Sequence, residues 1–417
     1  MSGTNRTLNV RPDPGEEAGL ALETVILLIF GVFMLLFGML LSRFLAGALP
    51  YSPDGAYGLF LVLTAFQVIT LGKTPYGDVR RSGFAVLAGI AAALLGMASC
   101  FVPGRLTDPV RLLVGMVLTT GGLSLFLQLA LSREKARRWL RLPGVPRHLA
   151  VGCGLVYLLS VVLGLVTLRP GYVPGYGVAG LLLADGFGLF YLAWAIQAVS
   201  RLKPPKGREE PSVAPGERRL AGRSRLLREA SLSPATATLI LLAVLLSFLG
   251  LVLLPVNLGL LNFSPDGLQG LLLVIFAIQM LSLGETPVGR FRRSWALVVF
   301  GVMFVGLGAF SCLVPGVLTH HLRVLLALLN LAAGSVFFAR RFVQQRRDRQ
   351  RVRAEAVSPI LVKLRGTQAV LNGTVIAFGI TMLVPGLVPG LLNAVIIVAN
   401  GLLLFRLAAI LGKLESR

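Results

Sequence analysis

The sequence predicts an all-α integral membrane protein with about twelve transmembrane helices in two parallel six-helix repeats. Three observations lead to this prediction: an apolar composition, a series of long apolar runs, and a sequence repeat. Of the 417 residues, 55% are hydrophobic and only 14% are charged. Because a soluble domain must cover its surface with polar side chains, this composition places the chain in a membrane.

The apolar runs have the length that membrane helices require. A helix crosses a bilayer with about 20 residues, and continuous runs favour helices over barrel strands, whose residues alternate in polarity. The first run lacks a small-residue cleavage pattern behind it, so we interpret it as an uncleaved helix. We expect spans near 24–48, 57–72, 83–102, 111–131, 149–169, 176–199, 234–256, 268–284, 295–314, 322–342, 368–384 and 390–412.

The repeat organises these spans into two halves. The string SPDG at 52–55 returns at 264–267, and Cys100 with the Pro-Gly that follows it returns as Cys312 at the same offset of 212. Each half holds six spans, and an even number gives both halves the same orientation. We divide the chain into an N-terminal tail (1–22), a first membrane repeat (23–200), a basic linker (201–233) and a second membrane repeat (234–417).

The charge of the chain predicts its orientation. The formal net charge is +22, and the basic residues gather in segments such as SREKARRWLRLPGVPRH and RRFVQQRRDRQRVR, between even-numbered spans and the next odd ones. Cationic loops stay on the cytoplasmic side, where they meet anionic lipid headgroups. We therefore expect the protein to lie in the inner membrane, with both termini in the cytoplasm. Nucleic acid is not an expected partner, because the basic residues lie between apolar runs.

Glycines at seven-residue steps predict helix packing. Gly89 and Gly96 precede the first Pro-Gly pair, Gly122 follows it, and Gly301 and Gly308 repeat the first two. Such small residues line one face of a helix and allow close approach in lipid. We expect the two helices joined by each Pro-Gly turn to be antiparallel neighbours.

A second repeated string marks a cytoplasmic turn. LGKTPYGDVRRS begins at Leu71 and returns as LGETPVGRFRRS from Leu283. Thr-Pro can end a helix, glycine permits the turn, and the arginine pair can bind lipid phosphate. A gating hinge is the alternative interpretation. The residues concerned are Gly72, Thr74, Pro75, Arg80, Arg81, Gly284, Thr286, Pro287, Arg292 and Arg293.

The hairpin GIAAALLGMASCFVPGRLTDPVRLLVGMVLTTGGLSLF, its mate around Pro315 and the flanking hairpins resemble units of the HdeD-like acid-resistance membrane proteins. Those proteins are six-helix chains of three glycine-seamed hairpins with a proline in the turn. One half of this chain, about 24–200, is similar in length and layout to one such protein. The resemblance implies a fused tandem with a role in membrane integrity or acid stress.

The repeated turn also has features of the major facilitator superfamily of secondary transporters. Gly72 and the Arg80-Arg81 pair have the spacing of the loop between helices 2 and 3 in that family, and Gly284 with Arg292-Arg293 repeats it. The acidic residue and the second glycine of that signature are replaced in both copies. Twelve helices in two parallel halves also fit, so a secondary transporter of small solutes is the alternative function.

Polar residues at depth are the best candidates for a site. Asp185 lies about ten residues into its span, and the repeat pairs it with Asn400 at an offset of 215. Gln67 and Gln279 occupy equivalent positions in the second span of each half. A carboxylate at this depth is costly, so Asp185 is a candidate proton or substrate site. If the halves enclose a solvated cavity, we expect Asp185 and the two glutamines to line it.

Bond-making chemistry is not expected. The three histidines, His148, His320 and His321, lack metal-ligand spacing, and no nucleophile motif stands beside them. We expect no cofactor, no metal and no enzyme activity. The sequence thus predicts a multi-pass inner-membrane protein for membrane homeostasis or stress resistance, or alternatively a transporter coupled to protons through Asp185.

Overall fold

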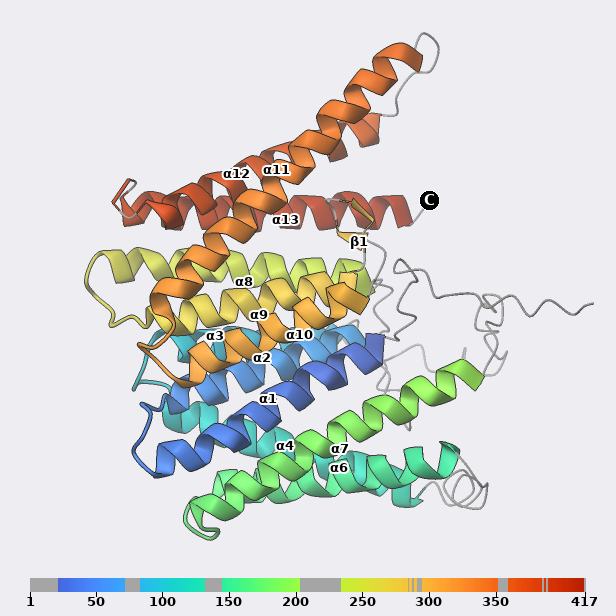
Figure 1. The fold of residues 1–417 in the computed structure, drawn as a ribbon, viewed down its shortest axis with the longest axis vertical. Helices are drawn as coiled ribbons and strands as arrows, with labels where there is room; N and C mark the ends of the chain where they lie inside the picture. Colours follow the sequence, from blue (N-terminus) through green and yellow to red (C-terminus); the bar gives the residue numbers. More distant parts are fainter. Residues whose placement is uncertain are drawn as a thin grey trace, which may run out of the picture.

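The structure is a computed structural model that describes residues 22–71, 83–131, 145–202, 234–283, 285–286, 289–290, 295–351, 359–384, 386–387 and 389–415. Within these ranges the helices are joined by turns and short irregular segments, and the remaining regular structure is two strands of two residues each. The described part holds twelve helices, as the apolar runs predict, and they lie roughly side by side across Figure 1. The protein is an all-α chain with the architecture of a multi-pass membrane protein.

Six helices belong to each half. The first half contains α1 (Leu22–Leu45), α2 (Pro53–Leu71), α3 (Gly83–Phe101), α4 (Thr107–Leu131), α6 (Val145–Leu168) and α7 (Gly175–Leu202). The second half contains α8 (Pro234–Asn257), α9 (Pro265–Leu283), α10 (Trp295–Leu313), α11 (Thr319–Arg351), α12 (Pro359–Leu383) and α13 (Gly390–Glu415). Between α9 and α10, strand β1 (Glu285–Thr286) pairs antiparallel with strand β2 (Gly289–Arg290).

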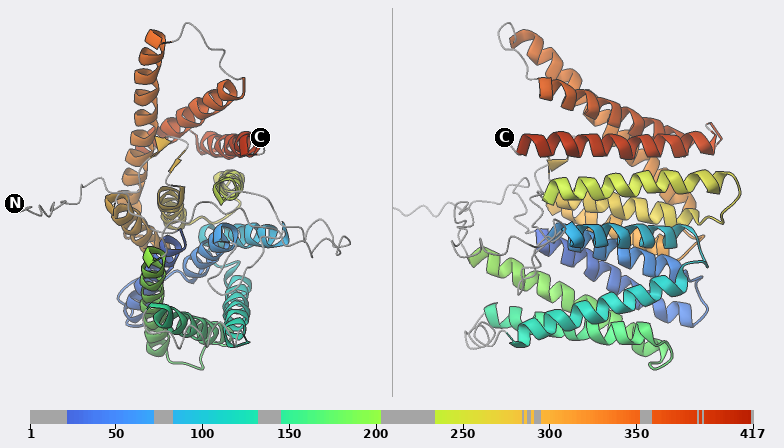
Figure 2. Two further views of the ribbon diagram at one scale, coloured as in Figure 1. Left: turned by 90° about the vertical axis from the view of Figure 1, so that its right-hand side faces the viewer. Right: turned by 180° about the vertical axis from the view of Figure 1, so that it is seen from behind.

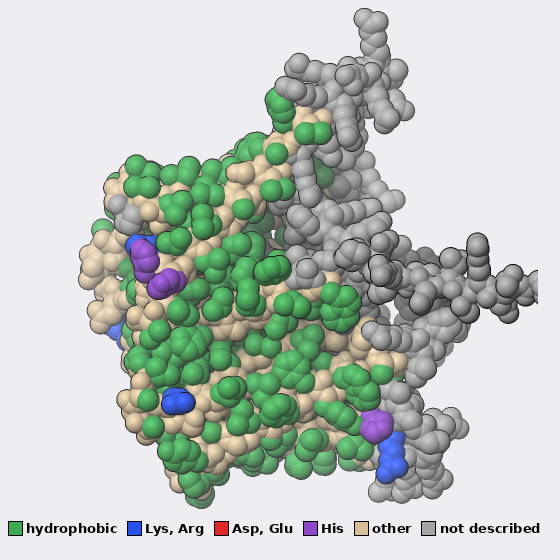
Figure 3. All heavy atoms as spheres, in the orientation of Figure 1, with side chains coloured by type: hydrophobic (Ala, Val, Ile, Leu, Met, Phe, Trp, Pro, Cys, Tyr) green, Lys and Arg blue, Asp and Glu red, His purple; other side chains and the backbone are tan. Residues whose placement is uncertain are grey.

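Length and composition allow seven described helices to cross a membrane: α1, α4, α6, α7, α8, α12 and α13. The apolar parts of α2, α3, α9 and α10 are shorter, at 10 to 17 residues. They pack in pairs, α2 along α3 and α9 along α10. Hydrophobic side chains are spread over the whole described part of the face drawn in Figure 3, as on a surface in contact with lipid.

Two helix starts differ from the sequence-based prediction. The SPDG strings were expected in loops, but Pro53 and Pro265 are the first residues of α2 and α9. The hydroxyl of Ser52 accepts a hydrogen bond from the backbone N–H of Gly55 at 3.1 Å. Serine at the N-cap and proline at the first helical position favour a helix start at this point.

One basic segment also differs. RRFVQQRRDRQRVR was expected to be a loop, yet α11 continues through most of it and ends at Arg351. Arginine and glutamine have high intrinsic helix propensity, so the helix extends beyond its apolar part.

Helix contacts repeat from half to half. In the first half α1 packs along α7, α2 along α3, and α4 along α6; in the second half α8 packs along α13, α9 along α10, and α11 along α12. The prediction that the helices joined by the turn at Pro103-Gly104 are close neighbours was wrong, because α3 and α4 touch only slightly. The glycines instead allow close packing between other helices, such as α3 and α2. A Cβ at Gly96 would lie 2.5 Å from the carbonyl oxygen of Gly58 on α2.

The two halves meet through their first three helices. Figure 2 shows these at the centre of the molecule, with α4, α6 and α7 at one end and α11, α12 and α13 at the other. Helix α1 contacts α10, and α3 contacts α8 in the corresponding way. Across this junction the N–H of Ser52 donates to the carbonyl of Leu313, and the N–H of Ser264 donates to that of Phe101, both at 3.0 Å. Each half therefore caps the end of a helix in the other half.

Candidate functional site

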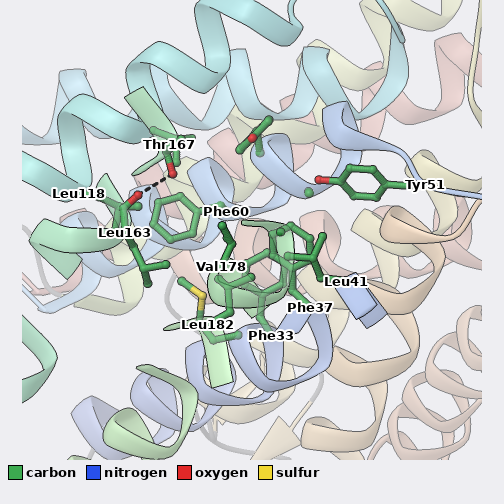
Figure 4. A pocket seen from close by; sticks show the side chains of 15 residues that line it. Phe33, Phe37, Leu41, Tyr51, Phe60, Leu118, Leu163, Thr167, Val178 and Leu182 are labelled. Carbon is green, nitrogen blue, oxygen red and sulfur yellow. Dashed lines mark hydrogen bonds between the residues drawn. The ribbon is translucent and has the colours of Figure 1, made fainter. Parts of the chain in front are cut away.

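The first half contains a cavity of about 260 Å³ among α1, α2, α4, α6 and α7 (Figure 4). Its position follows from the helix contacts: α7 packs on α1 and on α6, α6 packs on α4, and α2 contacts both α1 and α4, so the five helices surround it. Most of its lining is aliphatic or aromatic, including Phe33, Phe37, Phe60, Leu163 and Leu182. The volume is slightly below the range typical of small-molecule pockets.

The polar groups of the cavity are hydroxyls. Tyr51 precedes α2 and stacks on Phe44 with a centroid distance of 4.7 Å, and Figure 4 shows its hydroxyl turned toward the other labelled side chains. Burial raises the pKa of Tyr51, so this phenol stays neutral and can donate a hydrogen bond. The hydroxyl of Thr167 donates to the carbonyl of Leu163 at 2.7 Å, which leaves its oxygen able to accept. Tyr57 supplies a third hydroxyl to the lining.

Asp185 lies farther along α7 than the residues of that helix that line the cavity. It follows Val178 and Leu182 at helical spacing on α7, so the three residues share one helix face. At 1.5 Å per residue, Asp185 is about 15 Å from the start of α7. Its side chain is 3% exposed, and its Oδ1 has no hydrogen-bond partner among the described residues. A buried polar atom without a partner is costly, which marks this position as unusual.

Asn400 is satisfied where Asp185 is not. Its Oδ1 accepts a hydrogen bond from the hydroxyl of Thr374 on α12 at 2.9 Å. The repeat places Leu159 of α6 at the position of Thr374, so the first half lacks that hydroxyl. Asp185 therefore has no counterpart of the Thr374 hydroxyl that Asn400 binds. The surroundings of the two equivalent residues differ in this respect.

The structure does not gather the predicted site residues. Helices α7 and α13 lie in different parts of the molecule (Figure 1), so Asp185 and Asn400 belong to separate places. Gln67 is half-buried four residues before the end of α2. Gln279 occupies the same position in α9, and its side chain is not described. The cavity described above lies within one half, and neither Asp185 nor Gln67 is among its lining residues.

The predicted cytoplasmic turn falls mostly outside the described residues. This applies to Gly72, Thr74, Pro75, Arg80, Arg81, Gly284, Pro287, Arg292 and Arg293. Thr286 is described, and it pairs with Gly289 in the β1–β2 ladder.

Sequence reasoning missed a repeated polar site at the starts of α2 and α9. The carboxylate of Asp54 accepts a hydrogen bond from the backbone N–H of Gly104 at 2.9 Å and another from the hydroxyl of Thr107 at 2.5 Å. Asp266 binds Gly316 and Thr319 in the same way. Each aspartate thus ties the start of one helix to a turn two helices later. The 212-residue repeat of SPDG and Pro-Gly was the signal that could have revealed this pairing.

The second half has amides where the first-half cavity has apolar or phenolic side chains. By the repeat, Gln269 stands at the position of Tyr57, Asn330 at that of Leu118 and Asn393 at that of Val178. The side-chain oxygens of Gln269 and Asn393 are buried without a hydrogen-bond partner in the described chain. The halves have therefore diverged in chemistry at one equivalent place.

Comparisons with protein-family models, with curated proteins and with solved structures find no significant match to this chain. Its function is therefore inferred from its own residues.

Proposed function

We propose that this protein acts in membrane homeostasis or stress resistance by holding an apolar or amphipathic molecule of the bilayer in the cavity of the first half, without bond-making chemistry. The observation that carries the proposal is the lining of that cavity. Aliphatic and aromatic side chains form most of it, and Tyr51, Tyr57 and Thr167 add hydroxyls. Such a lining suits a hydrocarbon chain that ends in a hydrogen-bonding group. The resemblance to HdeD-like proteins supports the same class of function.

The position of the hydroxyls supports an amphipathic occupant. Tyr51 lies in the turn before α2, and Thr167 is in the last turn of α6, so both stand near the end of the spans rather than at mid-membrane. Deeper in the cavity the lining is Phe33, Met34 and Leu182. A molecule with its polar group at the membrane edge and its chain inward matches this gradient in polarity.

A cavity-filling substitution tests the proposal. The repeat places Phe378 at the position of Leu163, so Leu163→Phe fills the cavity with a residue that the other half already accepts. We expect 1-octanol to raise the unfolding temperature of the wild-type protein in nanodiscs, and to raise it much less in Leu163→Phe. Leu155→Phe on the same helix is the matched control, because Leu155 is exposed. An equal response from both variants would refute occupancy of the cavity.

Asp185 favours a second candidate function, proton-coupled transport through the first half. The supporting observation is its unpaired Oδ1, buried on the helix face that also lines the cavity. A rocking motion of the two halves is not favoured, because Ser52 and Ser264 bind backbone groups across their junction.

Asp185→Asn tests this second candidate. The substitution keeps the size of the side chain and removes its titration, so a proton relay should stop. In proteoliposomes with an internal pH-sensitive dye, we expect an imposed pH gradient to decay more slowly with the variant than with wild type. Equal decay rates at acidic and neutral pH would show that Asp185 serves packing alone.

A further inference from the structure

Two cysteines meet at the junction of the halves. Cys100 is the penultimate residue of α3, and Cys312 is the penultimate residue of α10, 212 positions later. Both side chains are buried, with exposed fractions of 3% and 2%. Both are free thiols in the structure. Neither the cavity nor Asp185 accounts for this pair.

Each cysteine contacts both halves. The thiol of Cys100 donates toward the carbonyl of Gly55 within its own half at 3.7 Å, and the thiol of Cys312 does the same toward Gly267. The carbonyl oxygen of Cys312 presses on Gly55 from the opposite half, and that of Cys100 presses on Gly267, so closely that neither glycine has room for a side chain. Such contacts between a glycine Cα–H and a carbonyl oxygen hold two helices at short distance.

The thiols also meet each other. Gly55 adjoins both cysteines, because its carbonyl oxygen lies 3.7 Å from the Cys100 sulfur and its Cα faces the carbonyl oxygen of Cys312, and the two thiols interact with each other. The two cysteines thus lie at the junction of the halves, where the backbones of α2, α3, α9 and α10 pack closely. Two cysteines that are only small hydrophobic residues have no need to face each other, whereas a disulfide requires neighbouring sulfurs.

We propose that Cys100 and Cys312 form a disulfide-forming site that joins the two halves covalently when a small peroxide reaches it. One sulfur attacks a peroxide oxygen of hydrogen peroxide, which breaks the O–O bond and gives a sulfenic acid and one water. The second sulfur then attacks the sulfenic sulfur, and the S–O bond breaks to release a second water. Two thiols are oxidised to one disulfide, and one hydrogen peroxide is reduced to two waters.

The position of the pair sets the consequence of oxidation. Cys100 and Cys312 lie one residue from the outer-turn ends of α3 and α10, beside the backbone bonds from Ser52 and Ser264 that already join the halves. A covalent bond at this point prevents any separation of the two halves there. The halves of the oxidised protein move as one body.

The test uses the full chain with a specific protease site inserted in the linker between residues 203 and 233. Purified protein is treated with hydrogen peroxide, cleaved at the linker and separated on a denaturing gel without reductant. We expect the two halves to migrate together as one band, and to separate after dithiothreitol. Cys100→Ala and Cys312→Ala should each give separate halves after peroxide. Cys153→Ala on α6 is the matched control and should still give the joined band.

Alkylation of the denatured protein with a maleimide-polyethylene glycol provides a second readout that does not depend on any variant folding. The chain has three cysteines, so the reduced protein should carry three adducts. The peroxide-treated protein should carry one, on Cys153. Three adducts after peroxide, or halves that separate without reductant, would overturn the proposal. A joined band that persists in Cys100→Ala would also overturn it, since the link would then lie elsewhere.

Discussion

At the scale of single residues, acidic side chains have two different roles in this chain. Asp54 and Asp266 are buried, and each satisfies a turn glycine and a helix-starting threonine. The turn glycines, Gly104 and Gly316, have positive φ angles of 83° and 85°, which only glycine adopts easily. Asp185 is buried too, but its Oδ1 lacks a partner among the described residues. All three aspartates are buried, so the presence or absence of hydrogen-bond partners distinguishes the structural aspartates from the candidate functional one.

Asp54→Ala should destabilise the protein. The substitution leaves the N–H of Gly104 and the hydroxyl of Thr107 without their acceptor, at a cost of about 1–3 kcal/mol. Asp266→Ala should cost a similar amount, because its bonds are the same. Asp108→Ala is the control: its ion pair with Arg111 is at the surface, with the aspartate 81% exposed, and should contribute little. Denaturant unfolding in detergent measures all three. A loss for Asp108→Ala as large as that for Asp54→Ala would contradict this role.

At the scale of helices, the sequence predicted where the helices are, but it did not predict which helices pack against each other. Apolar runs revealed all twelve described helices, since run length is a local property. The regularly spaced glycines correctly indicated close helix packing. They did not identify the partner helix, because a row of small residues shows only that another helix can come close to that face. Asp185 could be predicted as a site residue from its depth. The cavity could not, because it arises from the combined shapes of side chains on five helices.

Neighbouring glycines on α4 offer a test of the seams. A Cβ at Gly122 would lie 2.9 Å from the carbonyl oxygen of Tyr157 on α6, whereas a Cβ at Gly121 would meet nothing within 4 Å. We expect Gly122→Ala to cost about 1–3 kcal/mol, because the backbone of α6 must shift. Gly121→Ala should keep the stability or gain up to about 1 kcal/mol from helix propensity. Thermal unfolding of the two variants measures the difference, and equal unfolding temperatures would show that α4 and α6 are not packed at Gly122.

At the scale of the whole molecule, two similar halves are joined by equivalent contacts yet differ in their interiors. The junction uses the same backbone bonds in both directions, from Ser52 and from Ser264. The first half encloses a cavity with hydroxyls, while the second places amides such as Gln269 and Asn393 at equivalent positions. The equivalent contacts at the junction hold the two halves together. The different polar groups inside the halves allow each half to bind a different kind of molecule.

The orientation of the whole molecule gives the last prediction. Basic segments follow the fourth and sixth helices of the first half, α4 and α7, so the C-terminal ends of these helices should face the cytoplasm and the α6–α7 turn should face outward. Tyr172 in that turn and Leu131 at the end of α4 are both 75% exposed, and the native cysteines are buried. A membrane-impermeant maleimide should therefore label Tyr172→Cys in intact cells, and should label Leu131→Cys only after permeabilisation. The reverse pattern would place the hydroxyls of the cavity at the cytoplasmic face, and its occupant would have to enter from that side.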